Sequence, residues 1–85
     1  MVEIKYVITD PLGLHARPAG QLVKAATRYP CDIQIGTEAK MVDAKRILGV
    51  MGLSLKQGTE LTMTFCGAEE ETAAQEIQVF LAENL

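Results

Sequence analysis

The chain has 85 residues, of which 48% are hydrophobic and 5% aromatic, so it can bury one compact, mainly aliphatic core. This length predicts a single domain spanning residues 1–85. With 8 basic and 11 acidic residues the net charge is −3, so the chain lacks the basic field that bulk nucleic-acid binding requires. No leader pattern and no apolar stretch of about 18 residues occurs. We therefore expect a cytoplasmic protein without direct membrane insertion.

The N-terminal segment predicts a strand, and a helix follows it after a tight turn. Apolar side chains alternate with more polar ones at Val2, Ile4, Tyr6 and Ile8. Turn-forming residues at 10–13 end this strand. A helix is expected from Ala16 to about Arg28, because Ala19, Leu22, Val23 and Ala26 share one helical face. Pro18 suits the first helical turn, where the missing N–H has no intrahelical acceptor.

The rest of the chain alternates between short strands and helices. Strands are expected at residues 31–35, 40–44 and 61–66, with a turn at 36–39, a short weak helix at 47–55 and a last helix from Glu69. The buried stripe of that last helix is Ala73, Ala74, Ile77, Phe80 and Leu81, which leaves Val79 exposed. The resulting order β-α-β-β-α-β-α predicts an α+β fold, a four-stranded antiparallel sheet covered on one face by three helices.

The two cysteines do not indicate a metal site or a disulfide framework. Cys31 and Cys66 belong to no C-x-x-C pair, and the chain contains one histidine only. We interpret both as small apolar residues in strands, and we expect no metal and no cofactor.

Residues 13–19, Gly-Leu-His-Ala-Arg-Pro-Ala, contain the strongest candidate site. Gly13 permits an unusual backbone angle before the helix, and His15 would then lie at or near the N-cap. The backbone N–H groups of Ala16 and Arg17 would have no partner within the helix, which makes them a site for an anion. The Arg17 guanidinium adds donors suited to phosphate oxygens. A nucleophilic imidazole beside such a site predicts that His15 accepts a phosphoryl group.

This motif alone leaves a plainer alternative open, because a single histidine at a helix start is more often a cap or a packed polar residue. The chain has no Walker loop, no second histidine for a metal and no Ser-His-Asp set. A phosphoryl group on His15 would therefore have to come from another protein. This favours a carrier over a stand-alone enzyme.

The apolar segment at residues 46–53 indicates a docking surface for partners. A short helix can bury only one face, so inward-pointing Val50, Leu53 and Leu55 would leave other apolar side chains partly exposed. Those side chains are Ile47, Leu48 and Met51. The alternative is that the whole helix lies in the core.

Taken with Ala44-Lys45, Ile47-Leu48-Gly49-Val50-Met51 and Leu55-Lys56-Gln57-Gly58, the histidine motif resembles the HPr family, the histidine-containing phosphocarriers of the bacterial phosphoenolpyruvate-dependent sugar phosphotransferase system. The resemblance covers essentially the whole chain. It implies an open-faced β-sandwich, phosphorylation of His15 on Nδ1 and stabilisation of the phosphoryl group by Arg17. It also implies enzyme I as donor and IIA domains of sugar permeases as acceptors. Because a carrier that docks transiently is most simply a monomer, we expect a monomer. The implied docking surface comprises Gly20, Lys24, Ile47, Leu48 and Met51.

Two positions depart from the family pattern. Gly20 replaces a slightly larger residue, often Ala or Thr, and offers no side chain for docking. Arg46 replaces the serine that a dedicated kinase phosphorylates in Gram-positive members, which links the carrier to carbon catabolite repression. We expect that regulatory branch to be absent, and Arg46 to favour docking on acidic partner surfaces. A non-catalytic regulatory module and a carrier for nitrogen regulation are alternatives, and the presence of His15 favours a carrier over the module.

Overall fold

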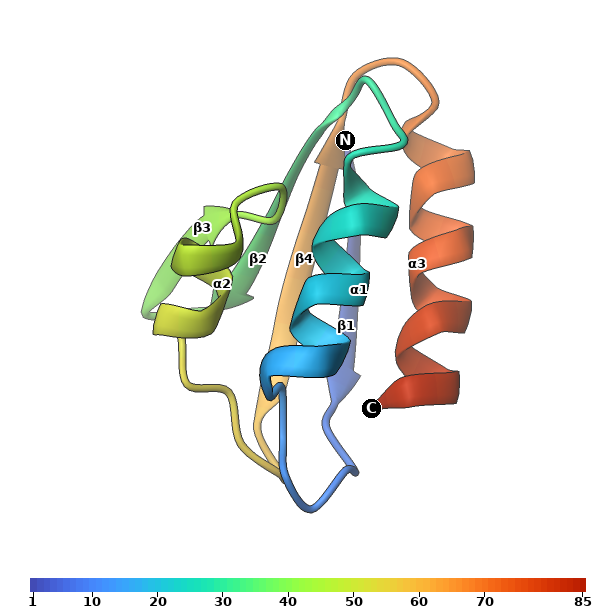
Figure 1. Ribbon diagram of the computed structural model, residues 1–85. Helices are drawn as coiled ribbons and strands as arrows, with labels where there is room; N and C mark the ends of the chain where they lie inside the picture. Colours follow the sequence, from blue (N-terminus) through green and yellow to red (C-terminus); the bar gives the residue numbers. More distant parts are fainter.

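The computed structural model describes residues 1–85, and its elements follow the expected order (Figure 1). These elements are β1 (Val2–Val7), α1 (Ala16–Ala26), β2 (Asp32–Thr37), β3 (Lys40–Asp43), α2 (Ile47–Gly52), β4 (Glu60–Cys66) and α3 (Glu70–Asn84). The strands form one antiparallel sheet in the order β1-β4-β2-β3, and the helices all lie on one face of it (Figure 1). The predicted α+β fold class is confirmed. None of the helices is both long enough and apolar enough to cross a membrane.

The sheet register gathers the alternating apolar residues of three strands on the face that the helices cover. Phe65 of β4 is paired with Val2 of β1 and with Ile33 of β2. A second row, two residues earlier on β4, consists of Ile4, Met63 and Ile35. Because strand side chains alternate between faces, these rows point into one layer, where Phe65 and Ile33 are fully buried.

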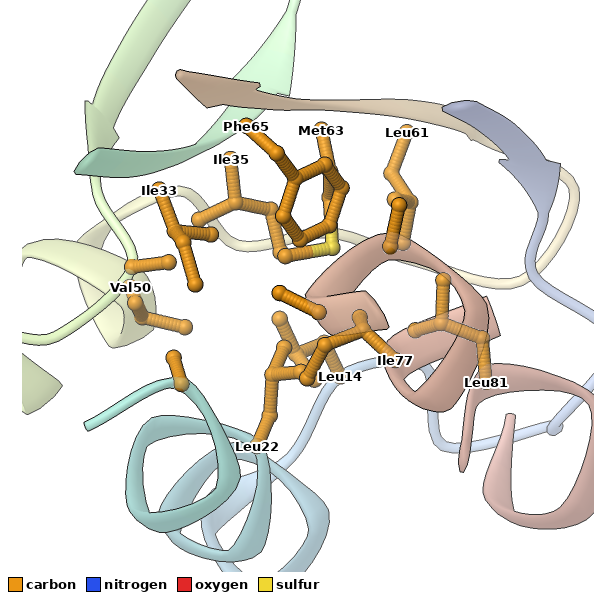
Figure 2. Packing of buried hydrophobic residues seen from close by; sticks show 14 of the residues in the cluster. Leu14, Leu22, Ile33, Ile35, Val50, Leu61, Met63, Phe65, Ile77 and Leu81 are labelled. Carbon is orange, nitrogen blue, oxygen red and sulfur yellow. The ribbon is translucent and has the colours of Figure 1, made fainter. Parts of the chain in front are cut away.

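The helices close the core on the covered face of the sheet, where Figure 2 shows Leu22, Val50, Ile77 and Leu81 among the buried side chains. Each such side chain contributes roughly 1.5–3 kcal/mol when it leaves water. Val79 of α3 is exposed, as its position outside the apolar stripe predicted. Phe80, which we expected inside that stripe, is only half-buried and packs against the rim of the core.

Several boundaries differ from those expected, each for a local reason. The helix α1 ends at Ala26 instead of near Arg28, and the Thr27 hydroxyl donates to the Lys24 carbonyl at 2.8 Å there. Gly36 is part of β2 and not of the turn, because it pairs with Met41. A β-carbon at Gly36 would lie 1.9 Å from the Lys40 carbonyl oxygen, so the close approach of these strands requires glycine.

The end of α2 also differs from expectation. It stops at Gly52 and not at Leu55, because Ser54 adopts a left-handed backbone with φ 52° that no helix continues through. Leu55 itself is buried beyond this turn.

The two cysteines have different environments, and neither is in a disulfide. Cys31 is buried immediately before β2, which agrees with its interpretation as a small apolar residue, and burial raises the pKa of its thiol. Cys66 does lie in a strand, but it is exposed. Its register partner is the exposed Asp32, on the sheet face that no helix covers, so the expectation of an apolar environment was wrong for Cys66.

Candidate functional site

The loop between β1 and α1 is fixed to the end of α3 by backbone hydrogen bonds. The Leu85 carbonyl oxygen accepts from the Thr9 N–H at 2.6 Å and from the Asp10 N–H at 2.8 Å. The Thr9 hydroxyl donates to the same oxygen at 2.8 Å. Further along, the Gly13 N–H donates to the Asp10 carbonyl at 2.9 Å, which closes the turn. The path of the chain toward His15 is therefore set by contacts from a distant part of the sequence.

Gly13 allows this loop to pass very close to the segment that follows α2. Its φ is +65°, a left-handed conformation that glycine adopts without strain. A β-carbon at this position would lie 2.3 Å from the Leu55 carbonyl oxygen. That same oxygen accepts a 2.8 Å hydrogen bond from the N–H of the buried Leu14. Glycine is therefore required both by the backbone angle and by the space.

His15 is the N-cap residue of α1, as the sequence predicted. Its backbone is extended, with φ −88° and ψ −179°, and its carbonyl accepts the Ala19 N–H at 3.0 Å. The imidazole makes no capping hydrogen bond and is half-buried. The ring is thus held at the opening turn of the helix while its nitrogens remain available to an incoming group.

Hydrogen-bond donors without partners lie next to His15, at the start of α1. The N–H groups of Ala16 and Arg17 take part in none of the backbone hydrogen bonds at the helix start. No acidic side chain occupies the first turn of α1, and the exposed Arg17 guanidinium takes part in neither of the ion pairs of the chain. Because the amides and the helix dipole both favour negative charge, the start of α1 can receive the oxygens of a phosphoryl group on His15.

Helix α2 lies beside α1 (Figure 1). It presents apolar side chains to solvent. Leu48 is 85% exposed, Ile47 40% and Met51 37%, whereas Val50 is buried. The predicted division of this helix is confirmed, and the alternative of a wholly buried helix is wrong. Gly20 and Lys24, the other residues of the predicted docking surface, lie on the exposed side of α1.

Arg46 is the N-cap residue of α2 and provides no side-chain cap. Its Nε atom lies 3.8 Å from an oxygen of Asp43, and both side chains are well exposed, so this contact is weak. The neighbouring Lys45 donates to the Tyr29 carbonyl at 2.7 Å, which ties the start of α2 to the end of α1.

Charge is divided between the two long helices. Helix α1 carries Arg17 and Lys24 and no carboxylate. Helix α3 carries no cation, and its charged residues are Glu70, Glu71, Glu76 and Glu83. The side of the molecule that contains His15 is therefore positive relative to the side formed by α3.

The site also uses groups that the sequence pattern did not indicate. Thr9, Leu55 and Leu85 hold the histidine loop through backbone atoms or a hydroxyl. Every residue except proline has a backbone donor, and every residue has an acceptor, so residue type offers no signal for such roles.

The fold and the site together define a small open-faced α+β domain with a histidine at an anion-receptive helix start. Residues 2–83 match the family model described as the PTS HPr component phosphorylation site. Over 79 residues, 93% of this chain and 90% of the relative, the chain is 46% identical to the phosphocarrier protein HPr of Lysinibacillus sphaericus. The chain belongs to the HPr family of phosphocarrier proteins of the phosphotransferase system.

Solved structures agree with this membership. The histidine-containing phosphocarrier protein of Mycoplasma superposes with a TM-score of 0.93 at 35% identity, covering 96% of this chain and 93% of that one. For HPr of Bacillus anthracis the TM-score is 0.86 at 34% identity, and the match covers 94% of this chain and 95% of that one. Crh of Bacillus subtilis, a swapped dimer, superposes with a TM-score of 0.77 at 34% identity, and the match covers 100% of this chain and 98% of that one. Because dimers occur among these neighbours, the monomeric state of this chain stays a prediction.

Proposed function

We propose that His15 accepts a phosphoryl group from phosphorylated enzyme I and passes it to IIA domains of sugar permeases. The observation that carries this proposal is the half-buried, uncapped imidazole of His15 beside the unpaired N–H groups of Ala16 and Arg17. Family membership supplies the phosphotransferase context.

Each of the two transfers forms one bond to phosphorus and breaks another. The lone pair of Nδ1 of the neutral His15 ring attacks phosphorus in line, and the bond between phosphorus and the donor side chain breaks, with its electron pair remaining on the donor. The three outer oxygens then rest against the amides of Ala16 and Arg17 and the Arg17 guanidinium. In the second transfer an acceptor side chain attacks phosphorus, and the Nδ1–P bond breaks.

Docking would use the exposed apolar side chains of α2 together with the exposed side of α1. Ile47, Leu48 and Met51 supply an apolar centre, while Arg17 and Lys24 supply positive charge beside it. Such a surface fits a partner with an apolar patch bordered by carboxylates.

The regulatory branch through a serine kinase is not expected here, because position 46 has no hydroxyl. We propose that Arg46 instead adds a permanent positive charge at the edge of the docking surface.

Incubation with enzyme I and phosphoenolpyruvate tests the carrier function. We expect one phosphoryl group per chain, labile in acid and stable in alkali, as phosphohistidine is. The chain has a single histidine, so the His15→Ala variant must show none. An unphosphorylated wild-type chain, tried with several enzymes I, would instead favour a regulatory module without carrier activity.

A further inference from the structure

Helix α3 carries a stripe in which two apolar side chains lie between two carboxylates. This α3 stripe consists of Glu76, Val79, Phe80 and Glu83, whose spacing of three, four and seven residues places them on one side of the helix. Val79 is 57% exposed and Phe80 is half-buried. Together with Gln75 these residues line an open groove of about 480 Å³. The core therefore leaves an apolar strip of α3 uncovered between two negative charges.

The first carboxylate of the α3 stripe is held in place by the rest of the fold. The hydroxyl of Tyr29, a buried residue after the end of α1, donates to Oε2 of Glu76. Glu76 takes part in neither ion pair of the chain, so its other oxygen can accept from a cation of another molecule. Because this carboxylate is already oriented, a partner that binds it loses less side-chain entropy.

The second carboxylate lies where the helix dipole disfavours it. Glu83 belongs to the last turn of α3, the negative end of the dipole, where a cation would stabilise the helix. No basic residue occupies this turn, and Glu83 has no ion-pair partner. The side chain that completes the turn is Asn84, whose amide donates to the Phe80 carbonyl at 3.0 Å. A cation from another molecule would offset a negative charge that no group of the chain offsets.

The α3 stripe is separate from the docking surface beside His15. Helices α2 and α3 lie on opposite sides of α1 in Figure 1, and the stripe shares no residue with that surface. The charges also differ, since α1 carries cations without a carboxylate, whereas α3 carries four carboxylates without a cation. Binding to the stripe therefore selects a different kind of partner from the one that docks at His15.

We propose that the α3 stripe docks a basic amphipathic helix of another protein. Seven residues of a helix span about 10 Å. Two cations seven residues apart on the partner helix, with apolar side chains between them, can therefore pair with Glu76 and Glu83 and cover Val79 and Phe80. Nucleic acids and acidic membrane surfaces do not fit, because the four carboxylates of α3 repel them.

A second copy of this chain fits the stripe less well. Its α1 offers cations seven residues apart, Arg17 and Lys24, but Gly20 and Gln21 lie between them where the stripe requires apolar side chains. Each copy also has a net charge of −3, so two copies repel each other. The partner is therefore a different chain with an excess of basic residues.

Binding of a designed peptide to isotope-labelled protein, followed by nuclear magnetic resonance, tests the proposal. The probe is an alanine-based helix with two arginines seven residues apart and leucines at the third and fourth positions after the first arginine. We expect saturable shifts along residues 75–83 with a Kd below about 1 mM. The His15→Ala variant should bind equally well, which separates this docking from the carrier function.

A second peptide of the same composition controls for charge alone. Its second arginine is moved by two residues, which places it on the opposite face of the helix. We expect this peptide to bind at least about fivefold more weakly. Equal affinities for the two peptides would overturn the proposal, and so would shifts centred on α1 or α2 or the absence of saturable binding.

Two variants with matched controls test the stripe itself. Val79→Ser should weaken binding about fivefold through lost apolar contact, and Glu83→Lys about tenfold through repulsion of arginine. Val7→Ser and Glu71→Lys make the same changes at exposed positions outside the stripe, and their affinities should stay within about twofold of wild type. Circular dichroism should show all four folded.

Wild-type affinity in both Val79→Ser and Glu83→Lys would overturn the proposal. A dimer of the chain that Val79→Ser dissociates, measured by sedimentation, would overturn it as well, because the stripe would then be covered by a second copy.

Discussion

The Leu14 N–H donates a 2.8 Å hydrogen bond to the Leu55 carbonyl, and this contact joins the loop that carries His15 to the segment after α2. Because Gly13 precedes Leu14 in a left-handed conformation, the two segments approach more closely than any side chain would allow. The placement of His15 thus depends on contact between the loop before α1 and the segment after α2.

Gly13→Ala should destabilise the protein by about 3 kcal/mol, because the new β-carbon adds a collision with the Leu55 carbonyl to the strain of the left-handed backbone. Urea denaturation followed by circular dichroism measures this loss. Gly58→Ala is the matched control, since its φ is +87° but no atom lies within 4 Å of the added carbon. That variant should lose only about 1 kcal/mol. Equal losses in the two variants would show that the contact with Leu55 has no energetic role.

Arg17→Lys should lower kcat/KM for phosphoryl transfer by about tenfold although the charge is kept, because an ammonium cannot present the planar pair of donors that a guanidinium offers to two oxygens. Stopped transfer assays with phosphorylated enzyme I give this ratio. The reverse exchange, Lys24→Arg, tests whether the type of cation matters at a position away from His15. We expect this variant to change kcat/KM little. A fully active Arg17→Lys variant would contradict a direct role of the guanidinium at the phosphoryl group.

Tyr29 makes stability sensitive to alkaline pH. Its hydroxyl hydrogen-bonds to a carboxylate oxygen of Glu76, and this bond, together with burial and the charge of Glu76, raises the pKa of Tyr29 to about 12. The stabilisation is fully present below the ordinary tyrosine pKa of about 10 and is lost as the pH rises toward 12.

Chemical denaturation between pH 9 and about 12 measures this loss in wild type. Tyr29→Phe should abolish the part of the alkaline loss of stability that comes from Tyr29. At neutral pH it should lower the free energy of unfolding by about 1 kcal/mol, the usual net contribution of one hydrogen bond. Tyr6→Phe, which removes the only other tyrosine hydroxyl, is the control and should keep the wild-type profile. An unchanged profile in Tyr29→Phe would place the origin of the alkaline sensitivity elsewhere.

Arg46→Ser should have two separable effects. Serine caps a helix start that Arg46 leaves uncapped, so stability should rise by about 1 kcal/mol. The loss of a positive charge should slow association with phosphorylated enzyme I at low salt and have little effect at high salt. Lys40→Ser removes the same charge from the β2–β3 hairpin and should not alter the rate. Unchanged low-salt kinetics in Arg46→Ser would remove the electrostatic role of Arg46.

The sequence predicts the elements well because most of them have a clear hydrophobic period, as at Ile4 and Leu22. It also places His15 correctly, since Pro18 and the motif around it define the helix start. It does not predict where Gly36 belongs, because a glycine that permits close strand pairing looks the same as one in a turn. The bond between Tyr29 and Glu76 joins residues far apart in the chain, and only the packed structure brings them together.

The unequal distribution of charge between α1 and α3 has a consequence for how encounters begin. The two cations of α1 and the four carboxylates of α3 contribute an electric dipole moment, and the field of a negatively charged protein exerts a torque on it. The molecule should therefore rotate before it makes contact, so that His15 faces the partner and a larger fraction of the encounters is productive.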